Sequence, residues 1–437
     1  MVCLVGDILT DVTLATANTP LKMRLGGIVH AARALWAMDL EYAVAYFAPS
    51  YMESHIDMFL KEHACKSIIK LGNVTNCPYT MLIQEAKEVG SQGYDFLYHD
   101  DIVIDYDTNA IKELSAFDDL VFISGNYNMN KVLSYIGNEC RLHCDVANSI
   151  NEVAELPQRR CFETLFISSS SNIFKNQYTS FIAFCDLLKP YAKRVVLKEN
   201  RGGSRVYETS SRETYHIPSQ TLPIAHSVGV GDVFDVVSIT APYDSYQDKL
   251  VLASWAAMEY ALTTFPDNFK NSVKGLLKTP IEDLKAQGGC ILPWEVRKRC
   301  QIYIAAPDFS FVETKQIDTL CDCLDYHHFV ARRPIKENGQ MSEDAGKKER
   351  LGLFCADMSL LGECNMLIAV LLYNDPGTLI EVGLAAQRGI PTLVYDPNKI
   401  ADNCMLTELP TLVSSDLDEI IAKVFTEYSK QYRNGTL

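Results

Sequence analysis

The 437-residue sequence lacks several features that would place it in a membrane, outside the cell or on nucleic acid. It has no run of 18 apolar residues, and its start, Met1 to Asp7, has no basic segment, so we expect neither a membrane span nor secretion. Its 14 cysteines have no regular spacing, which indicates reduced thiols. The 40 Lys and Arg are outnumbered by 55 Asp and Glu, and a net charge of −15 argues against a nucleic-acid groove. These absences favour a cytoplasmic protein that acts on small molecules.

The sequence also shows no internal repeat and no low-complexity tract. At this length, with 48% hydrophobic and 22% charged residues, two or three globular domains are expected. Apolar runs alternate with amphipathic stretches through residues 1–285, and this rhythm predicts a doubly wound α/β sheet. The glycine-containing segment 286–299 is predicted to be a linker. Residues 300–437 are predicted to form a second α/β domain.

The most informative stretch of the sequence is 374–385, which follows a buried strand predicted at 366–372. The turn at Gly377 leads into a helix, which would place Glu381 in the first helical turn at the carboxyl edge of a parallel sheet. Open α/β folds bind small ligands at that edge, and a carboxylate there can attack an electrophilic sugar carbon. The alternative is structural, because Thr378 and Glu381 also have the spacing of a capping box in which the threonine caps the helix.

Other polar residues occur near the ends of neighbouring elements in the same segment. Tyr303 lies on an apolar strand, Asp357 precedes the strand at 366–372, and Asn403 follows the next strand, at 391–395. In this order and spacing, together with the Asp-Pro-Gly-Thr-x-x-Glu-x-Gly stretch, residues 300–437 resemble the nucleoside 2-deoxyribosyltransferase family, whose fold is flavodoxin-like.

That resemblance implies roles for these residues. Glu381 would be the nucleophile and Tyr303 its orienting partner, while Asp357 and Asp375 would handle the base and its proton. Asn403 would contact the sugar 5′-hydroxyl, in the family commonly from a neighbouring subunit, so a homo-oligomer without a cofactor is expected. The resemblance implies two substrate-binding residues: Gly377 and Asn403.

The residue types suit cleavage of an N-glycosidic bond. Its transition state resembles an oxocarbenium ion, which a carboxylate can stabilise or capture as a covalent intermediate. The departing base needs an acid, so a second carboxyl is required. Transfer follows if another base enters, and hydrolysis follows if water enters. A related branch that hydrolyses nucleoside 5′-monophosphates carries serine in place of Asp375, so an aspartate here favours an unphosphorylated nucleoside.

The first domain has its own chemical motif at 226–234. Gly229 and Gly231 would let backbone N–H groups approach an anion at a helix start, and Asp232 could take the proton of a hydroxyl that attacks a phosphate. The alternative is that Asp232 simply caps the helix. Upstream, a strand predicted at 2–6 is followed by a polar turn that carries Asp7 and Asp11.

With Gly26-Gly27 and the segment 196–203, these features resemble the ribokinase-like (PfkB) family of sugar and nucleoside kinases over about residues 1–275. The resemblance implies ATP and Mg²⁺ as cofactors and Asp232 as the catalytic base. The implied binding residues are of two kinds: Asp11, Gly26 and Gly27 for the substrate hydroxyls, and Gly229, Gly231 and Lys198 for the nucleotide.

The sequence departs from this family at several positions. His226 and Ser227 replace an aspartate and a threonine, His30 or Ala31 replaces an asparagine, and Lys175 replaces the acid of a magnesium-linked motif that begins at Asn172. No Gly-x-x-x-x-Gly-Lys-Ser/Thr loop is present, so nucleotide binding would depend on the 229–231 turn. The first domain is therefore either an active kinase for a sugar or nucleoside, or a nucleoside-binding, regulatory or assembly module.

Two smaller patterns have structural interpretations. Cys321 and Cys323 with His327 and His328 have zinc-like residue types, but residues two apart do not share a helix face, so no metal site is expected. The charged stretch 336–350 is predicted to be a solvated loop, or else a lid over the glycosidic site.

Overall fold

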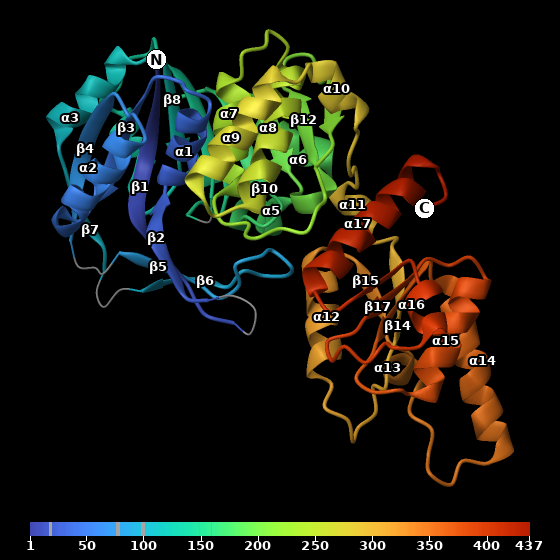
Figure 1. Cartoon of the computed structure of the whole chain (residues 1–437). Helices are drawn as coiled ribbons and strands as arrows, with labels where there is room; N and C mark the ends of the chain where they lie inside the picture. The colour runs from blue at the N-terminus through green and yellow to red at the C-terminus, as the bar shows by residue number, and fades with distance from the viewer. Residues whose placement is uncertain (17–19, 76–78, 98–100, 148, 159) are drawn as a thin grey trace. The chain divides into compact units, whose positions relative to one another are not determined.

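The computed structural model describes residues 1–16, 20–75, 79–97, 101–147, 149–158 and 160–437. They divide into two compact units (Figure 1). The first unit contains residues 1–87, 92–220 and 224–291, and the second contains residues 88–91, 221–223 and 292–437. Within these described ranges, no helix is long and apolar enough to cross a membrane.

The first unit is built around one large sheet with the strand order β13-β12-β11-β10-β9-β8-β1-β3-β4-β7. The strands from β11 to β4 along this order are parallel, and β12, β13 and β7 are antiparallel to their neighbours. The doubly wound α/β sheet expected from the sequence is therefore confirmed. The strands are β1 (Val2–Thr13), β2 (Lys22–Gly27), β3 (Tyr42–Ala48), β4 (Ser67–Thr75), β5 (Thr80–Ile83), β6 (Tyr94–Leu97), β7 (Val103–Tyr106), β8 (Asp119–Ile123), β9 (Arg141–Val146), β10 (Phe162–Ser168), β11 (Ala192–Lys198), β12 (Ser204–Glu208) and β13 (Thr214–Ile217).

The first strand is longer than the sequence predicted. We expected a strand at 2–6 and a polar turn carrying Asp7 and Asp11, and this expectation is wrong because β1 continues to Thr13. Beyond Asp7 the strand no longer pairs with β3. It pairs instead with β2 and β5, whose backbone groups form hydrogen bonds with it. Asp11 therefore lies directly opposite Arg24 across the β1–β2 pair.

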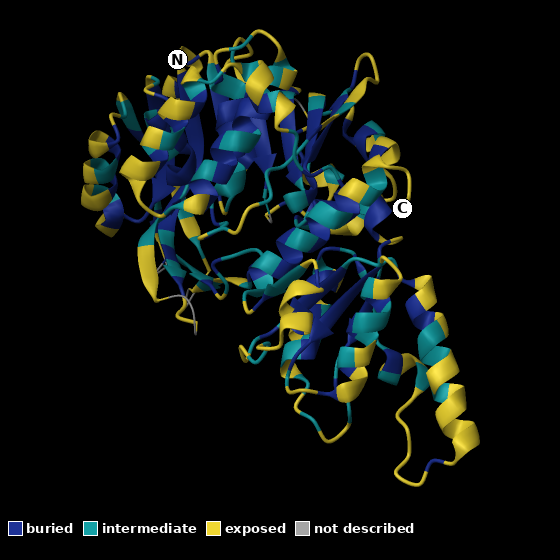
Figure 2. Cartoon of the chain, turned by 45° about the vertical axis from the view of Figure 1, so that its right-hand side comes forward, coloured by how far each residue is buried: buried dark blue, intermediate teal, exposed yellow. Residues whose placement is uncertain are grey.

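Helices cover the sheet of the first unit, whose strands are largely buried (Figure 2). One buried cluster joins side chains of β1 and β3 to those of α1, α2, α7, α8 and α9. The helices are α1 (Val29–Ala37), α2 (Glu53–Glu62), α3 (Thr108–Glu113), α4 (Met129–Leu133), α5 (Asn172–Gln177), α6 (Phe181–Leu188), α7 (Val230–Thr240), α8 (Tyr246–Leu262), α9 (Pro266–Lys278) and α10 (Ile281–Ala286). Four 3₁₀ turns occur at Ser50–Met52, Leu114–Ala116, Val153–Glu155 and Asn200–Gly202.

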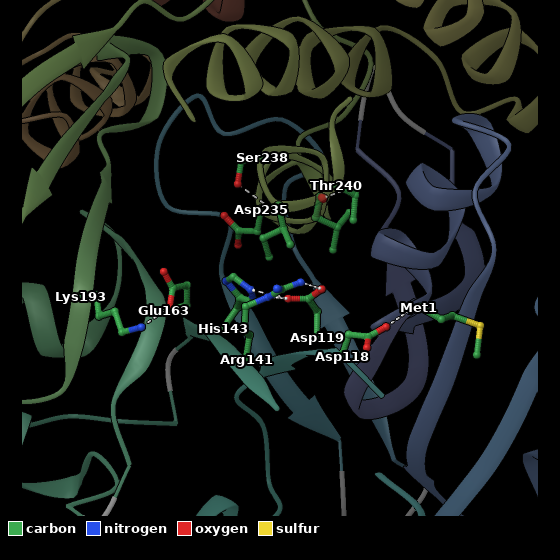
Figure 3. Close-up of polar contacts among 12 residues, drawn as sticks. Met1, Asp118, Asp119, Arg141, His143, Glu163, Lys193, Asp235, Ser238 and Thr240 are labelled. Carbon is green, nitrogen blue, oxygen red and sulfur yellow. Dashed lines mark hydrogen bonds and ion pairs between the residues drawn. The ribbon is translucent and has the colours of Figure 1, made fainter. Parts of the chain in front are cut away.

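Charged side chains connect the amino-terminal ends of adjacent strands in this sheet (Figure 3). Arg141, at the start of β9, donates two hydrogen bonds of 2.6 and 2.7 Å to Asp119, at the start of β8. His143 adds a contact of 3.4 Å to the same carboxylate. Although burial opposes the effect, these partners hold the pKa of Asp119 well below its usual range. This edge of the sheet is held by structural ion pairs, whereas the candidate site residues lie elsewhere.

The second unit contains a five-stranded sheet in the order β15-β14-β16-β17-β18, and every neighbouring pair is parallel. Numbered along the chain, this order is 2-1-3-4-5, which is the flavodoxin-like arrangement. The flavodoxin-like fold expected for this part is therefore confirmed. The strands are β14 (Gln301–Ala305), β15 (Val330–Arg332), β16 (Met366–Val370), β17 (Thr392–Tyr395) and β18 (Leu412–Ser414).

Helices of the second unit connect these parallel strands. The charged stretch 336–350, which we expected to be a loop, is helical only at its two ends, where α13 ends at Asn338 and α14 begins at Lys347. Residues 339–346, in its middle, lie outside helices. The helices are α11 (Trp294–Arg297), α12 (Lys315–Tyr326), α13 (Pro334–Asn338), α14 (Lys347–Glu363), α15 (Pro376–Gln387), α16 (Cys404–Glu408) and α17 (Leu417–Arg433).

Candidate active sites

Tyr303 and Glu381 meet in the second unit. Tyr303 lies on β14, and Glu381 lies on α15, which follows the adjacent strand β16. The strand order reverses between β14 and β16, and open α/β sheets bind ligands at such a switch point. The side chain of Tyr303 is fully buried, and its hydroxyl donates a hydrogen bond of 2.6 Å to Glu381 Oε1. The structure thus joins two residues that are 78 positions apart in the chain.

The start of α15 excludes the capping-box alternative. The N-cap is Asp375, whose Oδ2 accepts hydrogen bonds from the Thr378 backbone N–H at 2.8 Å and from its hydroxyl at 2.9 Å. Thr378 is therefore inside the helix, and Glu381 bonds to Tyr303 instead of the helix start. Because the helix begins at Pro376, Glu381 lies in its second turn. The expectation that Glu381 lies in the first turn is therefore wrong.

The surroundings of Glu381 favour its neutral form. Burial raises the pKa of Glu381 to about 7, and the nearby carboxylates of Asp357 and Asp375 add to this rise, while the hydrogen bond from Tyr303 opposes it. Burial also raises the pKa of Tyr303, so its hydroxyl remains a donor. Three carboxyl groups within electrostatic range, one of which titrates near neutrality, are typical of acid–base and nucleophilic sites.

The two aspartates are held in different ways. Asp375 is buried and uses Oδ2 for the cap, whereas its Oδ1 has no hydrogen-bond partner among the residues that the structure describes. Gly377, in the first turn of α15, is exposed. Asp357 is half-buried on α14, and its Oδ1 accepts a hydrogen bond of 2.8 Å from Asn338 Nδ2. Asn338 was missed by sequence reasoning, because it lies in a stretch that we interpreted as a loop.

Asn403 lies at a different place from the Tyr303–Glu381 pair. It is exposed, and it caps α16, with Oδ1 accepting a hydrogen bond of 2.9 Å from the Met405 backbone N–H. Apolar side chains are also exposed close to it in sequence, with Met405 at 67% and Leu409 at 43%. No direct contact joins Asn403 to Glu381 among the described hydrogen bonds and ion pairs.

The glycine turn of the first unit has the geometry of an anion site. Gly229 is the N-cap of α7 and adopts a left-handed backbone with φ +79°. A side chain at Gly229 would collide with His30, since an added Cβ would lie 2.2 Å from its Cγ. Gly231 follows in the first turn, and an added Cβ there would lie 3.3 Å from Lys198 Nζ. The positive end of an 11-residue helix, a close backbone approach and an ammonium group therefore coincide.

Asp232 is surrounded by charged groups that the sequence only partly indicated. Burial raises the pKa of Asp232 to about 8, Asp145 contributes to the rise and Lys198 opposes it. Lys198 Nζ lies 2.7 Å from Asp235 Oδ2 and 3.3 Å from Asp145 Oδ1. Although burial alone would lower the pKa of Lys198, Asp145 and Asp235 raise it, so the ammonium stays charged. Asp235 was missed by sequence reasoning, although it lies on the same helix as Asp232.

The residues expected to contact a sugar are grouped around Asp11. The carboxylate of Asp11 packs against Gly26, where an added Cβ would lie only 2.0 Å from Oδ1. His30 Nε2 lies 3.0 Å from Asp11 Oδ2, and its Nδ1 lies 2.7 Å from the hydroxyl of Tyr260. Burial lowers the pKa of His30 to about 4, so the ring is neutral at pH 7. Asp11 also contributes to the raised pKa of Asp232, which places both carboxylates in one electrostatic environment.

The metal-linked motif fits a divalent cation poorly. Asn172 begins α5, and Lys175, where the sequence resemblance implies an acid, is an exposed cation. An ammonium group repels Mg²⁺, whose preferred ligands are carboxylate, phosphate and water oxygens. Among the described residues, no three His, Cys, Asp or Glu side chains are grouped so as to hold a metal ion. The first unit thus presents residues suited to a phosphate group, but a lysine and not a carboxylate at position 175.

Comparison with known proteins gives a family for part of the chain. Residues 302–411 match the model of the nucleoside 2-deoxyribosyltransferase family. Solved structures that are similar to the chain cover 63–64% of it and 99% of their own length: phosphofructokinase-2 from Escherichia coli in complex with substrates and products (13% identity, TM-score 0.46), ribokinase from Thermotoga maritima (14%, 0.45) and ribokinase from Arabidopsis thaliana complexed with ribose and ATP (13%, 0.45). No curated protein matches the sequence. Residues 302–411 thus form a domain of the nucleoside 2-deoxyribosyltransferase family.

Proposed function

We propose that the second unit cleaves the N-glycosidic bond of a nucleoside and transfers the sugar through Glu381. The observation that carries this proposal is the 2.6 Å hydrogen bond from Tyr303 to Glu381 Oε1 at the switch point of the sheet. This bond engages one carboxylate oxygen and orients the other, so that Oε2 is the attacking atom. The match of residues 302–411 to a sugar-transferring family supports the same chemistry.

The reaction proceeds in two displacements. Glu381 Oε2 attacks the anomeric carbon as the C–N bond breaks, and the bonding electron pair leaves with the base. Asp357 or Asp375 donates the proton that the departing base takes up, since both carboxyl groups lie within electrostatic range of Glu381. A second free base then attacks the anomeric carbon and expels the Glu381 carboxylate, or water hydrolyses the ester.

The substrate is an unphosphorylated nucleoside. Asp375 stands where the branch that acts on nucleoside monophosphates carries serine, and a buried carboxylate repels a phosphate dianion at close range. Incubation of the full chain with single nucleosides and one free base, followed by chromatographic separation, tests this function. A new nucleoside or a released base supports it. If neither product forms from any purine or pyrimidine nucleoside, and wild type equals Glu381→Ala, the proposal is wrong.

A second copy of the chain is proposed to complete this site. Asn403 is exposed and makes no described contact with Glu381, whereas Ile380, on the same helix as Glu381, is 62% exposed. Burial of such apolar surface in a homo-oligomer would bring an Asn403 from a neighbouring subunit to the sugar. Light scattering at a concentration where the enzyme is fully active tests this assembly, and a single-chain mass there would contradict it.

For the first unit we propose ATP-dependent phosphorylation of a hydroxyl on a sugar or nucleoside. The specific observation is Asp232 at the positive end of α7, beside a left-handed Gly229 and above Lys198. Asp232 would accept the hydroxyl proton while the backbone N–H groups of the turn hold the phosphate. ATP would lie against this turn, and Lys175, unlike a carboxylate, offers no oxygen to the water shell of a Mg²⁺ ion.

The rival function for the first unit is nucleoside sensing without turnover. Two observations favour it: Lys175 replaces the metal-linked acid, and His30 already occupies an oxygen of Asp11. Calorimetric titration with ATP and with nucleosides, run beside a phosphorylation assay, separates the two functions. ATP binding with phosphorylated product supports the kinase, whereas nucleoside binding without either one supports the sensor.

A further inference from the structure

A separate polar hollow in the first unit is not used by either proposed reaction. It is lined by Arg24 from β2, Arg33 from α1, His226, Tyr260 from α8 and the segment 263–266. Its empty space is about 240 Å³ with the open mouth included. Gly229, Gly231 and Asp232 are not among its lining residues, so it differs from the glycine turn.

The two arginines have few protein partners. Arg33 Nη1 donates to the Tyr260 hydroxyl at 3.2 Å, and its buried Nε has no partner. Among the residues that the structure describes, no carboxylate forms an ion pair with Arg33. The nearby carboxylate of Asp11 contacts Arg24 and His30 instead. Arg24 Nη2 donates to the Val228 carbonyl at 3.4 Å, and its Nε lies 3.9 Å from Asp11. Because each guanidinium has five N–H donors, most of them remain available.

Apart from Asp11, whose carboxylate pairs with Arg24, the described groups around the hollow do not oppose the charge of the arginines. His226 is buried, and its Nε2 lies 2.9 Å from the Thr263 carbonyl oxygen. Because burial lowers the pKa of His226 to about 4, its ring carries no charge at pH 7. The described lining residues include no Asp or Glu, and Asp267, on the helix that begins at Pro266, is exposed and does not line the hollow. The 13-residue helix α9 begins at Pro266 beside the hollow and adds the positive end of its dipole.

We propose that this hollow binds a phosphate group between Arg24 and Arg33. Two guanidinium groups offer paired N–H donors that match the oxygens of a tetrahedral oxyanion, and Arg33 attracts it because no described carboxylate pairs with its charge. If the phosphate belongs to a larger molecule, the remainder lies outside, beside Phe265, which is 68% exposed.

The position of the hollow connects it to Asp11. Arg24 lies opposite Asp11 on the neighbouring strand, and Tyr260 joins Arg33 to His30, whose other ring nitrogen contacts Asp11. A phosphate bound to both arginines therefore touches the side chains that hold this carboxylate. Because phosphate binding is measured without turnover, the site can be tested separately from the proposed transfer and phosphorylation reactions.

Isothermal titration of sodium phosphate into the full chain, at constant ionic strength in chloride, tests the site. We expect saturable binding by the wild type and at least tenfold weaker binding by Arg33→Gln, which keeps a donor for Tyr260 but loses the charge. Arg33→Lys keeps the positive charge but loses the paired N–H donors of the guanidinium group, so its affinity for phosphate should lie between those of the wild type and Arg33→Gln. Arg212→Gln removes an exposed arginine paired with Asp186 and serves as the matched control with wild-type affinity.

Two results overturn the proposal: phosphate does not bind saturably to the wild type, or Arg33→Gln and Arg33→Lys, with wild-type melting temperatures, bind as tightly as the wild type. A parallel titration with a nucleoside 5′-monophosphate identifies the source of the phosphate group. Tighter binding that Phe265→Ala abolishes assigns the phosphate to a nucleotide. Equal affinity for the monophosphate and inorganic phosphate, both weakened by Arg33→Gln, assigns it to free phosphate.

Discussion

The raised pKa of Glu381 makes the stability of the second unit depend on pH. The Glu381→Gln variant replaces the carboxyl with a neutral amide whose oxygen can still accept the hydrogen bond from Tyr303. Burial raises the pKa of Glu381 from 4.5 to about 7 on folding. A shift of this size corresponds to about 3 kcal/mol of differential stabilisation of the protonated form.

The direction of the effect follows from the sign of this shift. Because the folded-state pKa of Glu381 is higher than the unfolded value, its contribution to stability is fully present below pH 4.5 and is lost as the pH rises through about 7. The wild type should therefore match Glu381→Gln at acid pH. Above about pH 7 the variant should be more stable, by up to about 3 kcal/mol in the free energy of unfolding.

Urea unfolding of both proteins between about pH 5 and pH 8 measures this difference, with the transition of the second unit followed by its own probe. Glu343→Gln, at an exposed position in the 339–346 loop, is the control and should show no pH-dependent difference from the wild type. If the stability difference between Glu381→Gln and wild type stays within about 0.5 kcal/mol over this range, the inferred environment of Glu381 is wrong.

Three further changes have defined outcomes. Asp232→Asn should reduce ATP-dependent phosphorylation at least about 100-fold while glycosidic cleavage is unchanged, because asparagine cannot accept a proton; equal phosphorylation rates would reject Asp232 as the base. Asn338→Ala should lower kcat for base exchange about five- to tenfold by freeing Asp357, with Asn338→Asp failing to restore it, and unchanged kinetics would show that the 2.8 Å bond is only structural. Gly229→Ala should destabilise the first unit by about 2 kcal/mol or more, because alanine is strained at φ +79° and its Cβ meets His30, and thermal melting at the wild-type temperature would contradict this.

The alternation of apolar and amphipathic runs was sufficient to predict the α/β sheet of residues 1–285, because parallel strands buried on both faces appear in the sequence as continuous apolar segments. The second α/β domain was predicted from the strand at 366–372, the stretch 374–385 and the family resemblance. The boundaries of individual strands and helices were harder to predict from the sequence. β1 extends to Thr13 because β2 and β5 pair with its second half, and strand pairing between distant segments leaves little local signal. Likewise, α15 begins at Pro376 because Asp375 caps it, although Thr378 is also a residue type that favours the N-cap position.

The candidate sites were predictable where a motif concentrates chemistry in a few consecutive residues, as around Glu381 and Asp232. Partners contributed by remote elements were harder to find. Asn338 reaches Asp357 only through the packing of α13 against α14, and Asp235 becomes significant only because β11 brings Lys198 beneath α7. The distance between such groups depends on the tertiary fold, which single-residue patterns do not encode.

Direct detection of a sugar on Glu381 is the most decisive measurement. The full chain is incubated without an acceptor base with a nucleoside that carries fluorine at C2′, which destabilises the oxocarbenium-like state and slows hydrolysis of the intermediate. Proteolysis and mass spectrometry then locate the adduct. We predict that the sugar is attached to Glu381 and that the adduct is absent in Glu381→Gln. A wild type that exchanges bases without any adduct, together with undiminished exchange by Glu381→Gln, would contradict the assignment of Glu381 as the nucleophile.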